Sequence, residues 1–280
     1  MQYRFVFLAD PQLGCHADLS GAGPERIAAF AARGMRVRPT PKVEGFDWEV
    51  GQLSKAATAI NHLRPTFVVV GGDLVHDIDD DGQIEAFLVA MDAVDDDIPV
   101  HWLPGNHDVA SADGVPDAAS LARYRQVFGP DRFAFEVGWA RFVALNTSLL
   151  GQPASVPTEA ADQMAFLVEQ LEEARTAGLR VVLLGHHPLF VERPDEPDSY
   201  WNIPLAHRRP VLDLVHRHGV RTGFAGHLHR NAHGRDGAFE MVTAAAVGCP
   251  LGDDPSGYLL VDVGEDVTHS FHPLDSGDHA

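Results

Sequence analysis

The sequence has few cysteines, no excess of positive charge and no long apolar run, and each shortage excludes a class of protein. The two cysteines, Cys15 and Cys249, lie far apart without the spacing of a zinc knot or a disulfide framework, so we expect reduced thiols. Against 40 acidic residues there are only 21 lysines and arginines, and the charge of −19 argues against nucleic acid or anionic membranes as partners. No apolar run approaches the length of a membrane span. Because the amino-terminal residues lack signal-peptide features, we expect a cytoplasmic location.

The composition suits one globular domain. The 280 residues are 45% hydrophobic, which is enough for a substantial core, and 16 histidines are more than structure alone requires. Segments with the apolar pattern of strands alternate with segments that have the pattern of helices. There is no internal sequence repeat and no obvious domain boundary, so we predict a single α/β domain over residues 1–280. Residues 17–47 are the least regular stretch, predicted as a surface excursion. The predicted strands are 5–9, 67–70, 100–103, 133–135, 142–145, 181–184, 221–225, 241–246 and 258–263, and the predicted helices are 25–33, 48–62, 84–94, 158–175 and 207–218.

Polar side chains follow five of the predicted strands at the point where each strand ends. The apolar run 67–70 continues directly into Gly71, Gly72 and Asp73, so a buried strand delivers one carboxylate to a tight turn. In layered α/β proteins function collects beyond the carboxyl ends of strands, and we expect the five ends to meet there. The side chains concerned are Asp10 with Gln12, Asp73, Asn106 with His107, His186, and His227 with His229.

Each of these residues taken singly has a structural explanation. An aspartate after a strand commonly holds a turn, and an Asn-His-Asp sequence is common in turns. The structural explanation gives no reason for all five groups to follow apolar strands. Their nitrogen and oxygen donors suit Mn, Fe or Zn, so the pattern predicts a metal site centred on Asp73.

In this arrangement the sequence resembles the calcineurin-like metallophosphoesterases, whose motifs run D-x-H, G-D, G-N-H-[DE], H and G-H-x-H in the same order. The resemblance extends from residue 3 to about residue 272. It implies a layered α/β/β/α sandwich in which two central mixed β-sheets are flanked by helices. It also implies two divalent or trivalent metal ions, one held by Asp10, Asp73 and His229 and the other by Asp73, Asn106, His186 and His227.

Gln12 departs from the commonest family pattern, which has a histidine ligand there. A glutamine offers a neutral and weaker amide oxygen, so the resemblance implies two unequal metal sites with Gln12 in the weaker one. A branch of serine/threonine phosphatases with this domain is similar at positions 10–12, 226–232 and 248–257. Another glutamine-bearing branch hydrolyses nucleotide diphosphates such as ADP-ribose, but the carboxyl-terminal motifs favour the first.

The resemblance implies hydrolysis of a phosphomonoester, on a small molecule or a phosphoprotein, by a metal-bridging hydroxide. His107 would protonate the leaving oxygen or stabilise its charge, with a structural role near the metals as the alternative, and Asp108 would orient its imidazole. Trp201, Arg230 and Asn231 are candidate substrate contacts, with core or bracing roles as alternatives. Cleavage of a phosphodiester or a diphosphate is the competing enzymatic hypothesis, and a non-catalytic metal-binding scaffold is the third. The sequence identifies neither the substrate nor the metal.

Overall fold

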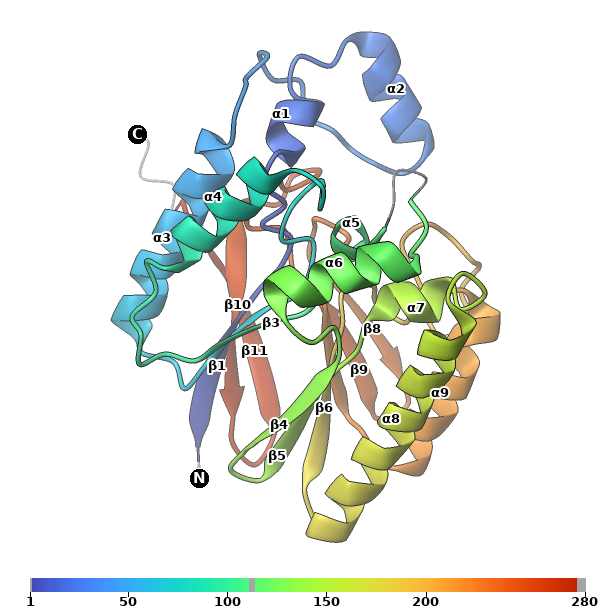
Figure 1. Ribbon diagram of the computed structural model, residues 1–280. Coiled ribbons are helices and arrows are strands. Elements are labelled where there is room, and N and C mark those ends of the chain that lie inside the picture. Colours follow the sequence, from blue (N-terminus) through green and yellow to red (C-terminus); the bar gives the residue numbers. More distant parts are fainter. Residues whose placement is uncertain (1, 111–113, 276–280) are drawn as a thin grey trace.

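The computed structural model describes residues 2–110 and 114–275, which form two β-sheets packed face to face with helices on their outer sides (Figure 1). The strands of the first sheet are, in spatial order, β11 (Val267–Pro273), β10 (Gly257–Val263), β1 (Tyr3–Leu8), β2 (Val68–Val70) and β3 (Val100–Trp102). Those of the second sheet are β4 (Phe133–Val137), β5 (Ala140–Ala144), β6 (Arg180–Leu184), β7 (Thr222–Ala225), β9 (Phe239–Thr243) and β8 (Ala232–Asp236).

Both sheets are mixed, as the resemblance implies. In the first, β1, β2 and β3 are parallel, whereas β10 is antiparallel to β1 and to β11. In the second, β5, β6, β7 and β9 are parallel, and the edge strands β4 and β8 are antiparallel to their neighbours. The parallel strands β1, β2, β6 and β7 therefore present their carboxyl ends to the loops that carry the predicted site residues.

The alternation of side chains along β1 explains why it is buried on both faces. Val6 and Leu8 belong to the hydrophobic cluster under the helices, whereas Phe5 and Phe7 belong to the cluster between the two sheets. Successive side chains of a strand point to opposite faces, so one apolar run serves both clusters. Aromatic rings fill the space between the sheets, with the Phe5 and Phe67 centroids 4.8 Å apart.

Long helices cover the outer faces of the two sheets. In Figure 1, α3 and α4 cover the first sheet and α8 and α9 cover the second. Short helices lie in the loops at the strand ends, and α2 lies in the irregular segment above them. The helices are α1 (Cys15–Leu19), α2 (Pro24–Ala32), α3 (Asp47–Leu63), α4 (Asp81–Met91), α5 (Asn106–Val109), α6 (Ala118–Phe128), α7 (Thr147–Gly151), α8 (Pro157–Ala177) and α9 (Leu205–Arg217).

Every predicted strand and helix is confirmed, with ends that differ by a few residues. The prediction missed α6, the two edge strands β8 and β11, and the short helices α1, α5 and α7. No helix in the described part of the chain is both long and apolar enough to cross a lipid bilayer.

Glu49 is a buried carboxyl group whose ionisation opposes folding. It lies in the first turn of α3, where Oε1 accepts hydrogen bonds from the backbone N–H groups of Gly14 and His16, at 3.0 and 2.8 Å. Its Oε2 is buried and has no hydrogen-bond partner among the described residues. Burial raises the pKa of Glu49 from its ordinary 4.5 to about 7. The unfolded chain therefore releases this proton at lower pH than the folded protein does.

Replacing Glu49 with glutamine is expected to stabilise the protein at neutral pH. Between pH 4.5 and 7 the folded state holds the proton that the unfolded state has lost, so stability falls as pH rises through this window. The variant does not lose stability in this way. Its free energy of unfolding should exceed that of wild type by up to about 3 kcal/mol at pH 8 and should equal it near pH 4. Urea unfolding at both pH values measures it, with Glu44→Gln on the exposed surface as control. An equal difference at both pH values would contradict the expectation.

Candidate metal centre

The loops that follow β1, β2, β3, β6 and β7 bring the predicted ligands together at one end of the sandwich. Asp10, Asp73 and His186 are almost completely buried, with exposed fractions of 0, 1 and 0%. Their ligand atoms all lie within 4.8 Å of one another. Buried acidic and imidazole side chains are rare unless they are paired or hold a metal. The sequence prediction that separate strand ends meet is therefore confirmed.

The backbone at these positions is strained. Six non-glycine residues in the described ranges have a positive φ, and one of them, Arg64, ends helix α3. A left-handed backbone costs a non-glycine residue about 1–3 kcal/mol, and such residues concentrate at functional sites. The other five are all predicted ligands: Asp10 (50°), Gln12 (40°), Asp73 (50°), His227 (70°) and His229 (51°).

Glycines let the backbone approach both carboxylates closely. A Cβ atom at Gly105 would lie 2.0 Å from Asp73 Oδ1, and one at Gly226 would lie 2.5 Å from Asp10 Oδ2. Both carboxylates also accept backbone hydrogen bonds, Asp73 from the N–H of His107 at 2.9 Å and Asp10 from that of His227 at 3.0 Å. These contacts fix the direction in which each carboxylate points.

Each of three histidines has one ring nitrogen within hydrogen-bond distance of a backbone carbonyl oxygen. The anchored atoms are His186 Nδ1, His227 Nε2 and His229 Nδ1, and the partners are the carbonyls of Gly71 (3.0 Å), Tyr200 (2.9 Å) and Cys249 (2.6 Å). A carbonyl fixes the donating nitrogen and leaves the other with a lone pair, as is usual for histidines that hold metals.

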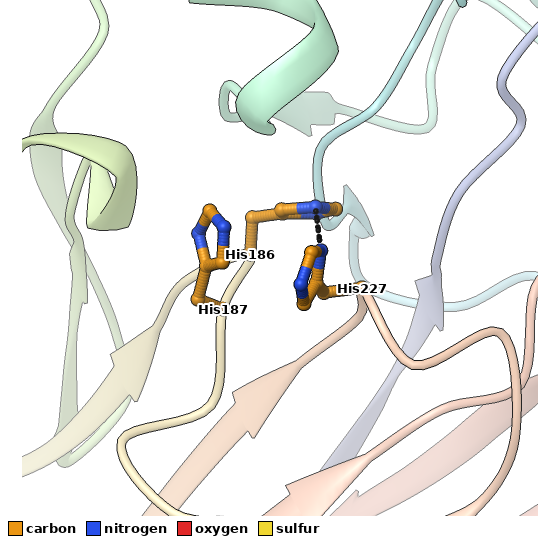
Figure 2. Close-up of side chains that lie close together, drawn as sticks. All are labelled: His186, His187 and His227. Atoms are coloured by element: carbon orange, nitrogen blue, oxygen red, sulfur yellow. Dashed lines mark hydrogen bonds between the residues drawn. The ribbon is translucent and has the colours of Figure 1, made fainter. Parts of the chain in front are cut away.

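The second nitrogen of each ring points inward. His186 Nε2 lies 3.2 Å from Asp73 Oδ2, and His229 Nε2 lies 3.5 Å from Asp10 Oδ1. His227 Nδ1 lies 3.2 Å from His186 Nε2, the contact drawn as a dashed line in Figure 2. Lone pairs that face each other in this way need a cation or a proton between them, so the donor set fits a metal ion.

Electrostatics keep a negative charge at the centre of the cluster. Burial alone would raise the pKa of Asp73, but the surrounding His186 and His107 hold it well below its usual range. Burial opposes the charge on His186 too, yet the Asp73 carboxylate raises its pKa to about 9. Burial and the neighbouring His186 lower the pKa of His227 to about 3, so this ring is neutral and able to donate a lone pair.

Gln12 has an amide oxygen that no protein group satisfies. Its Nε2 lies 3.3 Å from His76 Nδ1, whereas its buried Oε1 has no hydrogen-bond partner among the described residues. A buried carbonyl oxygen without a partner is costly unless it coordinates something. This oxygen fits the predicted role of Gln12 as a metal ligand, and His76 holds the amide in place.

The ring of His187, the residue that follows the predicted ligand His186, lies beside the cluster (Figure 2). Its ring centroid is 4.2 Å from that of His227, and one ligand nitrogen lies within 4.8 Å of those of His186 and His227. Burial holds the pKa of His187 well below its ordinary value. The pair of adjacent histidines after β6 was the sequence signal for this neutral flanking ring.

His107 has one anchored ring nitrogen, and the other has no hydrogen-bond partner among the described residues. Its Nδ1 lies 2.8 Å from the carbonyl oxygen of His76, whose ring stacks on it at 4.7 Å. The prediction that Asp108 orients this imidazole is wrong. The Asp108 carboxylate instead accepts backbone hydrogen bonds from Leu74, Val75 and Gly105, at 2.9, 3.2 and 2.7 Å. Asp108 therefore ties the loop after β2 to the short helix α5, and it positions Asp73 and Asn106 through the backbone.

A pocket of about 210 Å³ opens over the cluster. Gln12, Asp73, His107, His227 and His229 line it, and so does Trp201, the one of the three predicted substrate contacts that lies at this pocket. The two others are elsewhere. Arg230 is exposed outside the pocket lining, and the Asn231 side chain accepts a hydrogen bond from the Ala245 N–H at 3.1 Å, which favours the bracing alternative.

The sequence analysis missed Arg33, which also lines this pocket. It lies in the irregular segment 17–47, and no pattern there linked it to the strand ends. A lone arginine at the end of the predicted helix 25–33 was the only signal.

The sandwich of two mixed sheets, with Asp, Asn and His side chains at its strand ends, is the arrangement of a metallophosphoesterase. The chain belongs to the calcineurin-like phosphoesterase family, whose sequence profile matches residues 3–231. Serine/threonine-protein phosphatase CPPED1 of Danio rerio is 32% identical over 286 residues, which cover 98% of this chain and 85% of that protein. The Homo sapiens protein of the same name is 35% identical over 242 residues, covering 82% and 76%. The chain is thus a hydrolase of phosphate esters.

Solved structures show the same fold. A dimetal phosphatase from Danio rerio has a TM-score of 0.66 and 18% identity, covering 98% of this chain and 96% of that one. The purple acid phosphatase PPD1 from yellow lupin seeds has a TM-score of 0.67 and 13% identity, covering 99% and 52%. At these identities the likeness concerns the fold alone.

Proposed function

We propose that the protein hydrolyses phosphomonoesters at a centre of two metal ions bridged by Asp73. The single observation that carries this is the convergence of three carbonyl-anchored histidines on two buried carboxylates, beside an amide oxygen without a partner. One ion would be held by Asp10, Gln12, Asp73 and His229, and the other by Asp73, Asn106, His186 and His227.

When bound, two such cations activate water for in-line attack and neutralise charge on the phosphoryl oxygens. Side chains of the protein would hold the ions and transfer the proton. Asp73 would belong to both donor sets, and the His76 carbonyl holds His107 Nδ1, which leaves Nε2 to protonate the leaving oxygen. Asn106 lies at the centre, since its Oδ1 is 3.2 Å from His186 Nε2.

The two sites are proposed to be unequal. A neutral amide from Gln12 donates more weakly than an imidazole, whereas the second site has two imidazoles. The relatives named serine/threonine-protein phosphatases favour a phosphorylated serine or threonine side chain as the substrate of this protein.

Metal reconstitution followed by ester kinetics tests the proposal. The metal-free protein is loaded with Mn, Fe or Zn separately, bound metal is counted, and kcat/KM is measured on p-nitrophenyl phosphate, its bis ester and ADP-ribose. We expect two ions per chain, the second binding more weakly, and preference for the monoester. Preference for the bis ester or ADP-ribose would reject the monoester assignment. A metal-loaded protein inert on all three would instead favour a scaffold.

A further inference from the structure

The wall of the pocket over the metal centre comes from the segment 17–47, which we call the cap. Helix α2 within it is fully described and has no buried side chain, so it contributes little to either sheet's core. Its half-buried Phe30 lines the pocket, together with Met35 and Val37 of the following stretch. With Trp201, which lies next to Gly34 of the cap, these side chains form the apolar part of a pocket whose other lining includes polar residues of the metal centre.

Arg33 is the one arginine of the cap whose side chain has no partner among the described residues. The three others are engaged: Arg26 pairs with Asp18 at 2.7 Å, Arg36 pairs with Asp253 at 3.1 Å, and Arg38 donates to the carbonyls of Gly252 and Asp254. Arg33 and Tyr200 both line the pocket over the metal centre. Arg33 thus places an uncommitted guanidinium at the wall of a pocket that leads to the metal centre.

The pocket that Arg33 lines also contains Asp18, whose carboxylate pairs with Arg26 at 2.7 Å, whereas the other side of His107 carries two further carboxylates. There His107 and Asn106 line a second cavity, of about 420 Å³, together with Asp77 and Asp79. In a protein with a net charge of −19, two carboxylates at this cavity repel an anionic leaving group. An anionic group attached to the leaving oxygen is therefore directed toward Arg33.

We propose that Arg33 determines specificity for phosphomonoesters whose leaving group has an apolar body and a second anionic group. This inference rests on the proposed function and adds the class of leaving group to it. The apolar body would lie between Phe30 and Trp201, and the second anion, a carboxylate or a further phosphate, would accept hydrogen bonds from the guanidinium. A planar fork of N–H donors suits either anion.

Two matched esters test this on the metal-loaded protein: phenyl phosphate and 4-carboxyphenyl phosphate, which differ by one carboxylate. The ratio of their kcat/KM values is measured for wild type, Arg33→Gln and the control Arg36→Gln, whose arginine belongs to the cap but pairs outside the pocket. We expect Arg33→Gln to lower the ratio roughly tenfold, as for loss of a charge-assisted hydrogen bond, and the control to retain it.

Comparing ratios cancels the intrinsic reactivity of the two esters. A ratio unchanged in Arg33→Gln, with phenyl phosphate hydrolysed normally, would overturn the role of Arg33 and leave the proposed function intact. Failure of wild type to hydrolyse either ester would contradict the proposed function itself. An equal fall in Arg36→Gln would show that any positive charge on the cap suffices, which also overturns the assignment to Arg33.

Discussion

Replacing Asp73 with asparagine is expected to lower kcat/KM by about a thousandfold or more and to release most of the bound metal. Asp73 is the residue that belongs to both proposed donor sets, and His186 and His107 hold its carboxylate in the charged form. Asparagine has the same shape and tolerates the left-handed backbone at this position, so the substitution removes the charge with little change in geometry. Loss of several kcal/mol of transition-state stabilisation corresponds to this fall in rate.

Metal analysis and steady-state kinetics on the purified variant measure the effect. A thermal melt compared with that of the metal-free wild type separates loss of metal from loss of fold. Asp79→Asn is the control, because Asp79 is exposed near the site but outside both donor sets. Retention of two ions and of near-normal activity in Asp73→Asn would contradict the bridging role.

Replacing His107 with alanine is expected to lower turnover by about a hundredfold to ten-thousandfold while bound metal stays close to wild type. Its Nε2 has no hydrogen-bond partner among the described residues, and its hydrogen bond to Asp73 comes from the backbone N–H, which the substitution retains. The defect should depend on the leaving group. An alkyl phosphate, whose leaving oxygen needs a proton, should lose far more activity than p-nitrophenyl phosphate, whose leaving group departs as an anion.

Kinetics on the two esters and metal counts, with exposed His62→Ala as control, measure this difference. Equal losses on both esters would argue against proton donation. Loss of both metal ions would make His107 a structural part of the centre.

The fold was predictable where burial left a strong pattern. The runs that became β1, β2 and β6 are almost entirely apolar, because each is buried on both faces. The edge strand β8 has the sequence Ala-His-Gly-Arg-Asp and pairs only with β9, so its apolar content gave no signal. Helix α6 is a different case, because its buried Leu121, Tyr124 and Phe128 recur at helical spacing and a search for that period would have found it.

The site was predictable to the extent that strand ends determine it. Each predicted ligand directly follows an apolar run, so the sheet topology alone brings them together. The role of Asp108 was not predictable, because it depends on which backbone N–H groups of the neighbouring loop point at its carboxylate. Arg33 was missed for a related reason, since the cap's place above the pocket comes from contacts with distant loops such as that between Arg36 and Asp253.

Because α2 has no buried side chains, substrate preference and folding stability depend on different residues in this protein. Substitutions at the surface of α2 alter what a substrate meets, yet they leave both sheets and the strained ligand loops as they are. Substrate preference can therefore diverge in this protein with little cost in folding stability. Proteins that share the strand-end residues can then differ in the compounds they hydrolyse.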